Sequence, residues 1–441
     1  MPRPEGQCNV ASPYTLETMK TTNNTPALNP TRLWERVDAL AQYTVAGQPW
    51  TRRAFSDLFL QARAWLTTQF EAAGLTVHLD AAGNLVGRRE GHHPNAKPIV
   101  TGSHCDTVLS GGRFDGIIGV LAGIEVAHAL HEQGIILDHP FEVIDFLSEE
   151  PSDYGISCVG SRAIAGLLDE TMLNARDQTG ETLAAGIARV GGNPPALSMP
   201  LRPTDSTAAF VELHIEQGPV LETKGLPIGI VTNIVGIRRY KVMIDGQPDH
   251  AGTTPMDIRR DALVGAARVI EAVNGHARSM LDGPDYVVAT IGHLVLTPNA
   301  SNAVPGHVEM MLEVRSDSPA VLQTFADDVM SGVRDRVESL GLQLVCTQVS
   351  DSLPTDCTPF MVDLIEQAAI NLGYACLRMP SGAGHDAVYL AKTGPMGMIF
   401  IPCLKGRSHC PEEWIEPRQL LDGTRVLYET VMALDRSLPV N

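Results

Sequence analysis

Strand-like and helix-like segments alternate along much of this 441-residue chain. Residues 98–102 form a compact apolar run typical of a strand, residues 117–133 have the pattern of a helix, and residues 141–147 read as a second buried strand. A strand, a helix and a strand in this order predict a mainly parallel sheet with helices on both faces. The pattern resumes after residue 354, so the expected fold class is α/β.

The pattern changes between residues 236 and 352. A strand, a long helix, two strands, a second long helix and a last strand follow one another there. This β-α-β-β-α-β order predicts an inserted α+β unit of the ferredoxin-like kind. We therefore expect one discontinuous domain made of residues 31–235 and 353–441, an inserted domain made of residues 236–352, and a loose polar tail at residues 1–30.

The net charge and the cysteine content argue against some kinds of partner and against a disulfide-bonded protein. The formal net charge is −18, which disfavours a nucleic acid or an anionic membrane surface as the main partner. The eight cysteines are scattered and include no CxxC pair, which is typical of reduced thiols in a cytoplasmic protein. The most apolar stretch, residues 117–130, is too short to cross a bilayer, and the N-terminus does not read as a secretory signal.

Five polar clusters lie within or directly after predicted strands. Taken singly, each has a simpler explanation, such as a surface hydrogen bond, a helix cap or a solvated acidic pair. Taken together, they supply several imidazoles and carboxylates at strand ends of one α/β domain, where such domains build their sites. Nitrogen and oxygen donors without thiolate suit Zn²⁺, Mn²⁺, Co²⁺ or Ni²⁺. The clusters are residues 102–107 (GSHCDT), 111–116 (GGRFDG), 148–150 (SEE), 211–219 (VELHIEQGP) and 380–387 (PSGAGHDA).

Two details of these segments, and one residue outside them, suggest roles. Asp106 stands two positions after His104, so in an extended segment both side chains share a face and the carboxylate can hold the imidazole. The Glu149-Glu150 pair can divide its work, with one carboxylate on a cation and the other free as a general base. Arg315 ends a predicted strand and can grip a carboxylate with two hydrogen bonds, although an ion pair with a neighbouring acid is the simpler interpretation.

Eight motifs of the chain occur in a recognisable order. They are GSHCDT, GGRFDG, EE, GSRA, ELHIEQGPVLE, HAGTTPMDIRRDA, SGAGHDA and SHCPEE. On these motifs the chain, from residue 31 onward, resembles the metal-dependent amidohydrolases of the M20 peptidase superfamily. It is most similar to the hydantoinase/carbamoylase branch, which holds N-carbamoyl-L-amino-acid hydrolases, β-ureidopropionases and allantoate amidohydrolases. The resemblance implies a metal-binding catalytic domain with an inserted lid and dimerisation domain.

The resemblance also implies a site with two divalent ions per subunit, Zn²⁺ ahead of Mn²⁺, Co²⁺ or Ni²⁺. Asp115 would bridge the ions, with His104 and His214 completing one and Glu150 and His385 completing the other. Glu149 would be the general acid/base, and Asp106 would orient His104.

The remaining implied residues concern the substrate. His250 would polarise the scissile carbonyl, while Gln217, Asn302 and Arg315 would hold the substrate, Arg315 by its carboxylate. The resemblance implies a homodimer in which His250 and Asn302 reach the partner's site. His409, in SHCPEE, would line the site without an assigned role.

The expected activity is hydrolysis of the ureido C–N bond of an N-carbamoyl-L-amino acid, giving the amino acid, ammonia and carbon dioxide. One departure leaves the substrate open. Many relatives follow the Glu-Glu pair with Gly and a basic-aromatic pair, whereas here Pro151, Ser152, Asp153 and Tyr154 follow. The alternatives are an allantoate amidohydrolase or β-ureidopropionase, an aminoacylase or dipeptidase, and a catalytically silent metal-binding dimer.

Overall fold

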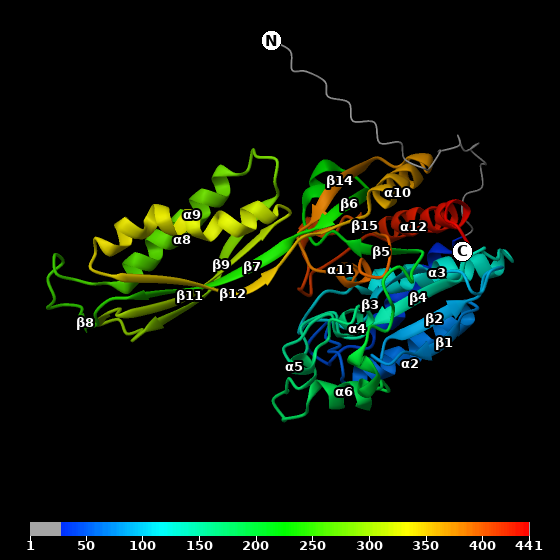
Figure 1. Cartoon of the computed structure of the whole chain (residues 1–441), viewed down its shortest axis with the longest axis horizontal. Helices are drawn as coiled ribbons and strands as arrows, with labels where there is room; N and C mark the ends of the chain where they lie inside the picture. Colours follow the sequence, from blue (N-terminus) through cyan, green and yellow to red (C-terminus); the bar gives the residue numbers. More distant parts are fainter. Residues whose placement is uncertain (1–27, 441) are drawn as a thin grey trace, which may run out of the picture.

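The computed structural model describes residues 28–440, so most of the expected N-terminal tail lies outside the described residues. Two sheets dominate this part of the chain (Figure 1), a nine-stranded one and a four-stranded one. We call them the larger and the smaller sheet. None of the helices described combines the length and the apolar character needed to cross a bilayer.

The larger sheet has the order β1-β2-β4-β3-β5-β15-β6-β13, with β14 pairing to β6. Its central strands β4, β3, β5 and β15 run parallel to one another, and β2 and β6 flank them in antiparallel pairing. The prediction of a mixed α/β fold with a mostly parallel central sheet is thus confirmed. The strands are β1 (Thr76–Leu79), β2 (Leu85–Arg89), β3 (Ile99–His104), β4 (Phe141–Phe146), β5 (Ala209–Ile215), β6 (Ile228–Ile234), β13 (Thr355–Asp356), β14 (Cys376–Ser381) and β15 (Met396–Ile401).

Helices pack on this sheet. The helix α3 (Ile117–Glu132) packs against β3, β4 and β5, and nearly all of its residues are buried, as an apolar helix requires. It approaches the sheet closely because Gly119 faces the carbonyl of Leu213, where a Cβ would lie 2.5 Å from the oxygen. The other helices are α1 (Pro30–Ala41), α2 (Asp57–Ala72), α4 (Val159–Ile164), α5 (Glu170–Leu173), α6 (Leu183–Arg189), α7 (Val220–Lys224), α10 (Pro359–Asn371), α11 (Ala387–Leu390) and α12 (Pro417–Ser437), with short 3₁₀ turns at Pro194–Ser198 and Leu404–Gly406.

The smaller sheet is antiparallel, with the order β12-β7-β11-β9. Residues of β11 alternate between buried and partly exposed, as expected when one face of a sheet meets a core and the other meets solvent. The smaller sheet and its two helices form their own hydrophobic cluster, and we call them the smaller unit. Its elements are β7 (Gly236–Asp245), α8 (Ala262–Ser279), β9 (Val287–Thr297), β11 (His307–Ser316), α9 (Pro319–Glu338) and β12 (Gln343–Ser352), and β8 (Asp249–His250) pairs with β10 (Ala303–Val304) beside them.

The chain order of the smaller unit is strand, helix, strand, strand, helix, strand. In Figure 1 this unit projects away from the larger sheet, with β7 and β12 leading toward it. Its role as a lid or dimerisation domain, and the division of the chain into domains, remain predictions.

Candidate metal centre

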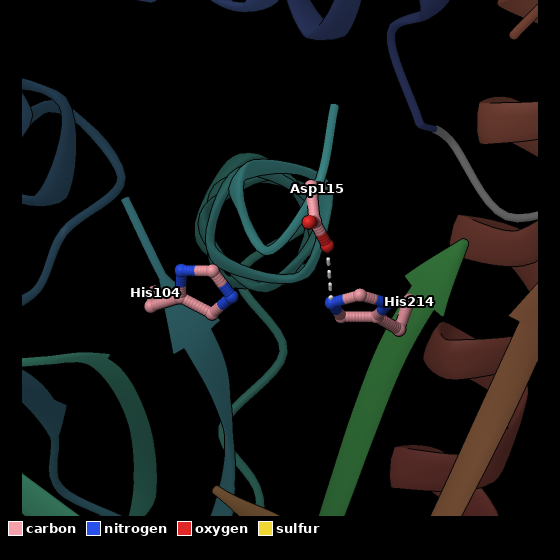
Figure 2. A group of neighbouring side chains, drawn as sticks. All are labelled: His104, Asp115 and His214. Carbon is pink, nitrogen blue, oxygen red and sulfur yellow. Dashed lines mark ion pairs between the residues drawn. The ribbon is translucent and has the colours of Figure 1, made fainter. Parts of the chain in front are cut away.

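Two strand ends and one helix start bring three of the predicted donors together. His104 is the last residue of β3, His214 lies near the end of the parallel strand β5, and Asp115 lies two positions before the first residue of α3. Figure 2 shows these three side chains facing one another. Each can offer one donor atom, and the three atoms lie within 4.8 Å of one another. This is the edge at which α/β sheets place their sites.

A second group of donors shares Asp115 with the first. Asp115, Glu150 and His409 also offer donor atoms within 4.8 Å of one another. The two oxygens of Asp115 face different imidazoles, because Oδ1 lies 3.2 Å from His214 Nε2 and Oδ2 lies 2.9 Å from His409 Nε2. His409 Nε2 is also 3.2 Å from Glu150 Oε1. One carboxylate therefore joins two potential cation sites.

Two of the histidines are held so that the same ring nitrogen faces the cluster. Nδ1 of His104 lies 3.0 Å from the carbonyl oxygen of Asp106, and Nδ1 of His214 lies 2.9 Å from that of Ile215. A carbonyl oxygen only accepts hydrogen bonds, so each Nδ1 is the donor. Nε2 of each ring is left as the nitrogen that can bind a cation.

Among the described residues, His385 shares no donor group with Glu150, so its place on the second ion stays a prediction. Its Nε2 lies 2.9 Å from Ser381 Oγ, and its donor group is formed with Glu212 and His214. The structure brings His409, not His385, to Asp115 and Glu150. Both histidines lie in loops, and their positions along the chain do not reveal which loop folds over the shared carboxylate.

Asp106 was predicted to orient His104 with its carboxylate, and in the structure its backbone carbonyl makes the closer contact. Its backbone carbonyl, not its side chain, accepts the hydrogen bond of His104, and its Oδ1 is 3.6 Å from the same nitrogen. The carboxylate instead accepts the backbone N–H groups of Glu149 and Glu150, each at 3.2 Å. Asp106 thus ties the loop after β3 to the loop after β4.

Glu149 lies at the edge of the donor cluster. Its Oε2 is 3.5 Å from Nε2 of His104, and its Oε1 accepts a hydrogen bond from the thiol of Cys158 at 3.4 Å. Its side chain is 13% exposed, so it is less enclosed than the carboxylates of Asp115 and Glu150, which are each 6% exposed. Cys158 was not singled out from the sequence, because only the fold brings it beside Glu149.

The electrostatics of the cluster favour a cation. Burial raises the pKa of Glu149 well above its ordinary value, and the carboxylates of Glu150 and Asp386 raise it further. Burial likewise raises the pKa of Asp106 to about 6. For His104, burial lowers the pKa, but the surrounding carboxylates outweigh it and raise the value to about 9. Protons are retained where buried negative charge is in excess, and a divalent ion would relieve the same excess.

Of the predicted substrate residues, Gln217 contacts the cluster and Arg315 contacts the loop that carries His385. The amide of Gln217 donates to both oxygens of Asp115, at 3.1 Å each. Arg315 donates to the carbonyl of Gly382 at 2.7 Å and pairs with Glu313. Gly382 belongs to the loop that carries His385, so Arg315 lies where the smaller unit meets the larger sheet.

The other two predicted substrate residues lie elsewhere. His250 and Asn302 are exposed and sit beside each other, since the N–H of Ala251 donates to the carbonyl of Asn302 at 2.9 Å. Figure 1 places β8, which ends at His250, at the far end of the smaller unit. The predicted contribution of these two residues to a partner's site remains a prediction.

The sequence and the fold were compared with known proteins. The family model described as Peptidase family M20/M25/M40 matches residues 100–433. An N-carbamoyl-L-amino-acid amidohydrolase of Paenarthrobacter aurescens is 38% identical over 406 residues, covering 92% of this chain and 98% of its own length. An allantoate amidohydrolase of Bacillus subtilis is 33% identical, covering 90% and 96%. A hydantoinase/carbamoylase family amidase from Burkholderia multivorans superposes with a TM-score of 0.86 at 36% identity, covering 93% of this chain and 99% of that one.

Proposed function

The chain belongs to peptidase family M20/M25/M40, in its hydantoinase/carbamoylase branch, and we propose on that premise that it hydrolyses N-carbamoyl-L-amino acids. It is a hydrolase of carbon–nitrogen bonds, and the proposed products are the amino acid, ammonia and carbon dioxide. The observation that carries the proposal is the carboxylate of Asp115, which is shared by two donor groups beside Glu149.

The donor chemistry fits two divalent cations. His104 and His214 would hold one ion and Glu150 and His409 the other, with Asp115 between them. Nitrogen and oxygen donors favour Zn²⁺, with Mn²⁺, Co²⁺ or Ni²⁺ as alternatives. Such ions supply Lewis acidity at a carbonyl oxygen and make water more acidic.

Glu149 is proposed to move the proton. Its carboxylate takes a proton from the water that attacks the carbamoyl carbon, and it returns that proton to the amino-acid nitrogen as the C–N bond breaks. The released carbamate then decomposes to ammonia and carbon dioxide. His250 of a second copy of the chain would stabilise the negative charge that develops on the carbamoyl oxygen.

Arg315, Gln217 and Asn302 are proposed to hold the rest of the substrate. The guanidinium of Arg315 can bind the carboxylate of an amino acid with two parallel hydrogen bonds. Its contact with the Gly382 loop supports this role, because it brings the side chain next to the segment that leads to His385. A substrate held in one orientation by these residues faces a lower barrier to reaction, and its binding favours the exclusion of water from the site.

We further propose a homodimer formed through the smaller unit. The edge strand β9 exposes Val288, Leu294 and Val295, each by more than a third. The neighbouring helix α8 exposes further apolar side chains, among them Val264 and Ile270. An unpaired edge strand with exposed apolar residues favours pairing with another copy.

The experiment is a hydrolysis screen with the metal-loaded protein. It compares N-carbamoyl-L-amino acids, allantoate, β-ureidopropionate and N-acetyl amino acids under one set of conditions. The proposal predicts the highest kcat/KM for an N-carbamoyl-L-amino acid. A higher value for one of the other three would assign a different substrate, and no turnover on any of them would favour a catalytically silent protein.

A further inference from the structure

Glu413 is a buried carboxylate that belongs to neither donor group. It is 1% exposed. Its Oε1 accepts the backbone N–H of Phe114 at 2.7 Å and that of Asp115 at 3.0 Å, and its Oε2 accepts the hydroxyl of Ser408 at 2.7 Å. All three partners belong to segments that carry a proposed ligand.

These contacts join two loops that are far apart in the sequence. Asp115 and Glu413 are separated by 298 positions along the chain. One loop ends in Asp115, and the other carries His409 directly after Ser408. The hydroxyl of Ser408 also lies 3.3 Å from Oδ2 of Asp115, the oxygen that faces His409. Glu413 therefore connects, by hydrogen bonds, the loop that ends in Asp115 and the loop that carries His409.

The local packing leaves room for this carboxylate and for little else. A Cβ on Gly112 would overlap Oε2 of Glu413, so the backbone there approaches the carboxylate directly. The next residue, Trp414, packs edge-on against Phe114 with ring centroids 5.4 Å apart. The guanidinium of Arg113 lies 5.5 Å from the ring centroid of Trp414. Residues 413 and 414 thus hold the segment before α3 by hydrogen bonds and by ring packing.

A purely structural role would make this placement costly. Glu413 is buried next to a second buried carboxylate, Asp115, and like charges repel in a poorly solvated region. A cation beside Asp115 would offset that repulsion, so ion binding makes the carboxylate tolerable at this position.

We propose that Glu413 is a positioning residue, which holds Asp115 and His409 at the spacing that lets them bind one cation together. The inference rests on the proposed function, because it takes Asp115 and His409 as ligands. What Glu413 contributes is the reach of its oxygens to the two loops, so its charge is expected to matter less than its length.

Two conservative variants distinguish the effect of the side chain's length from the effect of its charge. Glu413→Gln keeps the length, and its amide oxygen can accept the same backbone N–H groups while its NH₂ donates to Ser408. Glu413→Asp keeps the charge but withdraws the carboxylate by one methylene. Asp80→Ala is the control, because it removes a carboxylate that accepts the N–H groups of Ala82 and Asn84 in a turn with no proposed ligand.

Calorimetric titration of the metal-depleted proteins with Zn²⁺ or Mn²⁺ is the measurement, with thermal unfolding of each variant alongside. Glu413→Asp is expected to bind one of the two ions ~10–100-fold more weakly, as is usual when a group that orients a ligand is lost. Glu413→Gln and Asp80→Ala are expected to bind both ions like the wild type.

The inference is overturned if Glu413→Asp binds both ions as tightly as Asp80→Ala, or if Glu413→Gln is as weak as Glu413→Asp. If Glu413→Asp does not fold, Ser408→Ala replaces it, with weaker binding of one ion expected and unchanged binding contradicting the inference. A wild-type protein that binds no pair of ions would instead remove the proposed function. The two failures are thus distinguishable.

Discussion

Glu149 differs from the other carboxylates of the cluster in how it is held. Its Oε1 accepts the thiol hydrogen of Cys158, whereas Asp115 and Glu150 face His409. Its side chain is 13% exposed, against 6% for Glu150. A carboxylate at the edge of the donors can exchange protons with solvent, while the enclosed ones are suited to holding ions.

Replacing Glu149 by Gln is expected to abolish most turnover while ion binding persists. The amide has the shape of the carboxylate but cannot take a proton, so kcat should fall by ~10²–10⁴-fold. Metal content and hydrolysis are measured on the same preparation. Glu216→Gln is the matched control, since that buried glutamate binds the backbone N–H groups of Val220 and Leu221 and touches no donor. Wild-type turnover in Glu149→Gln would remove this residue from the mechanism.

Removing the metal is expected to change how stability depends on pH. The pKa of Asp106 is raised to about 6 and that of His104 to about 9, above the ordinary values of 3.8 and 6.5. Groups with raised pKa values stabilise the folded protein at low pH and lose that contribution as pH rises through the folded value. The contribution of Asp106 is lost as pH rises from 3.8 to about 6, and that of His104 as pH rises from 6.5 to about 9, so the metal-free protein should lose stability in these two steps.

Thermal unfolding with and without a chelator, across this pH range, is the measurement. Bound ions displace protons from His104, so metal affinity should rise with pH. The difference in Tm between metal-loaded and metal-free protein should widen accordingly. If the Tm difference were the same at every pH, ion binding would not be coupled to the loss of protons from Asp106 and His104.

The sequence pointed to several of the candidate donors because their motifs follow strands. His104, Asp115, Glu150 and His214 were named as ligands from the family resemblance, and the fold brings donor atoms of His104, His214 and Glu150 near Asp115, while their role as ligands stays a prediction. His409 could not be placed this way. The segment that carries it folds back through Glu413 and Trp414, and this return depends on contacts with a loop nearly three hundred positions earlier.

At the scale of elements, the start of α3 positions the shared carboxylate. Gly116 is the residue before the helix and has φ +68°, a conformation that other residues adopt at a cost. It also lies against His104, since a Cβ there would overlap Nε2 of that ring. The helix start and the end of β3 are therefore in direct contact.

Gly116→Ala is expected to lose both stability and ion binding. The left-handed backbone alone costs about 1–3 kcal/mol, and the added methyl displaces His104. Gly134→Ala is the control, because Gly134 has φ +66° at the other end of α3 and open space around its Cβ position. Urea unfolding and metal titration are measured on both variants. Equal metal affinity in the two would show that contact with His104 is unimportant.

The periodicity of the sequence predicted where helices and strands lie better than it predicted which strands pair with each other. The two long helices expected between residues 236 and 352 are α8 (Ala262–Ser279) and α9 (Pro319–Glu338). The pairing of β14 with β6 was not foreseen. Hydrophobic period identifies the faces of a strand, but hydrogen-bonding neighbours depend on contacts between distant segments.

At the scale of the whole molecule, our proposal is that two copies of the chain share each active site. His250 lies at the far end of the smaller unit and has no described contact with its own donor cluster. A heterodimer of one His250→Ala chain and one Glu149→Gln chain contains one site with both residues intact. Such a dimer, isolated with two affinity tags, should show about half of the wild-type activity.

The control places both substitutions in one chain and pairs it with a wild-type chain. If His250 acts across the interface, this dimer has no complete site and is inactive. Activity in the control, together with none in the first heterodimer, would show that each chain uses its own His250. A protein that stays monomeric would contradict the proposed assembly itself.

The most direct test of the account is the position of the ions. Anomalous X-ray diffraction from crystals of the protein loaded with Zn²⁺ or Mn²⁺ locates them independently of any assay. The account predicts two peaks roughly 3.5–4 Å apart, on either side of the Asp115 carboxylate, with His104 and His214 at one and Glu150 and His409 at the other. A single ion, or a second ion bound through His385 instead of His409, would contradict it.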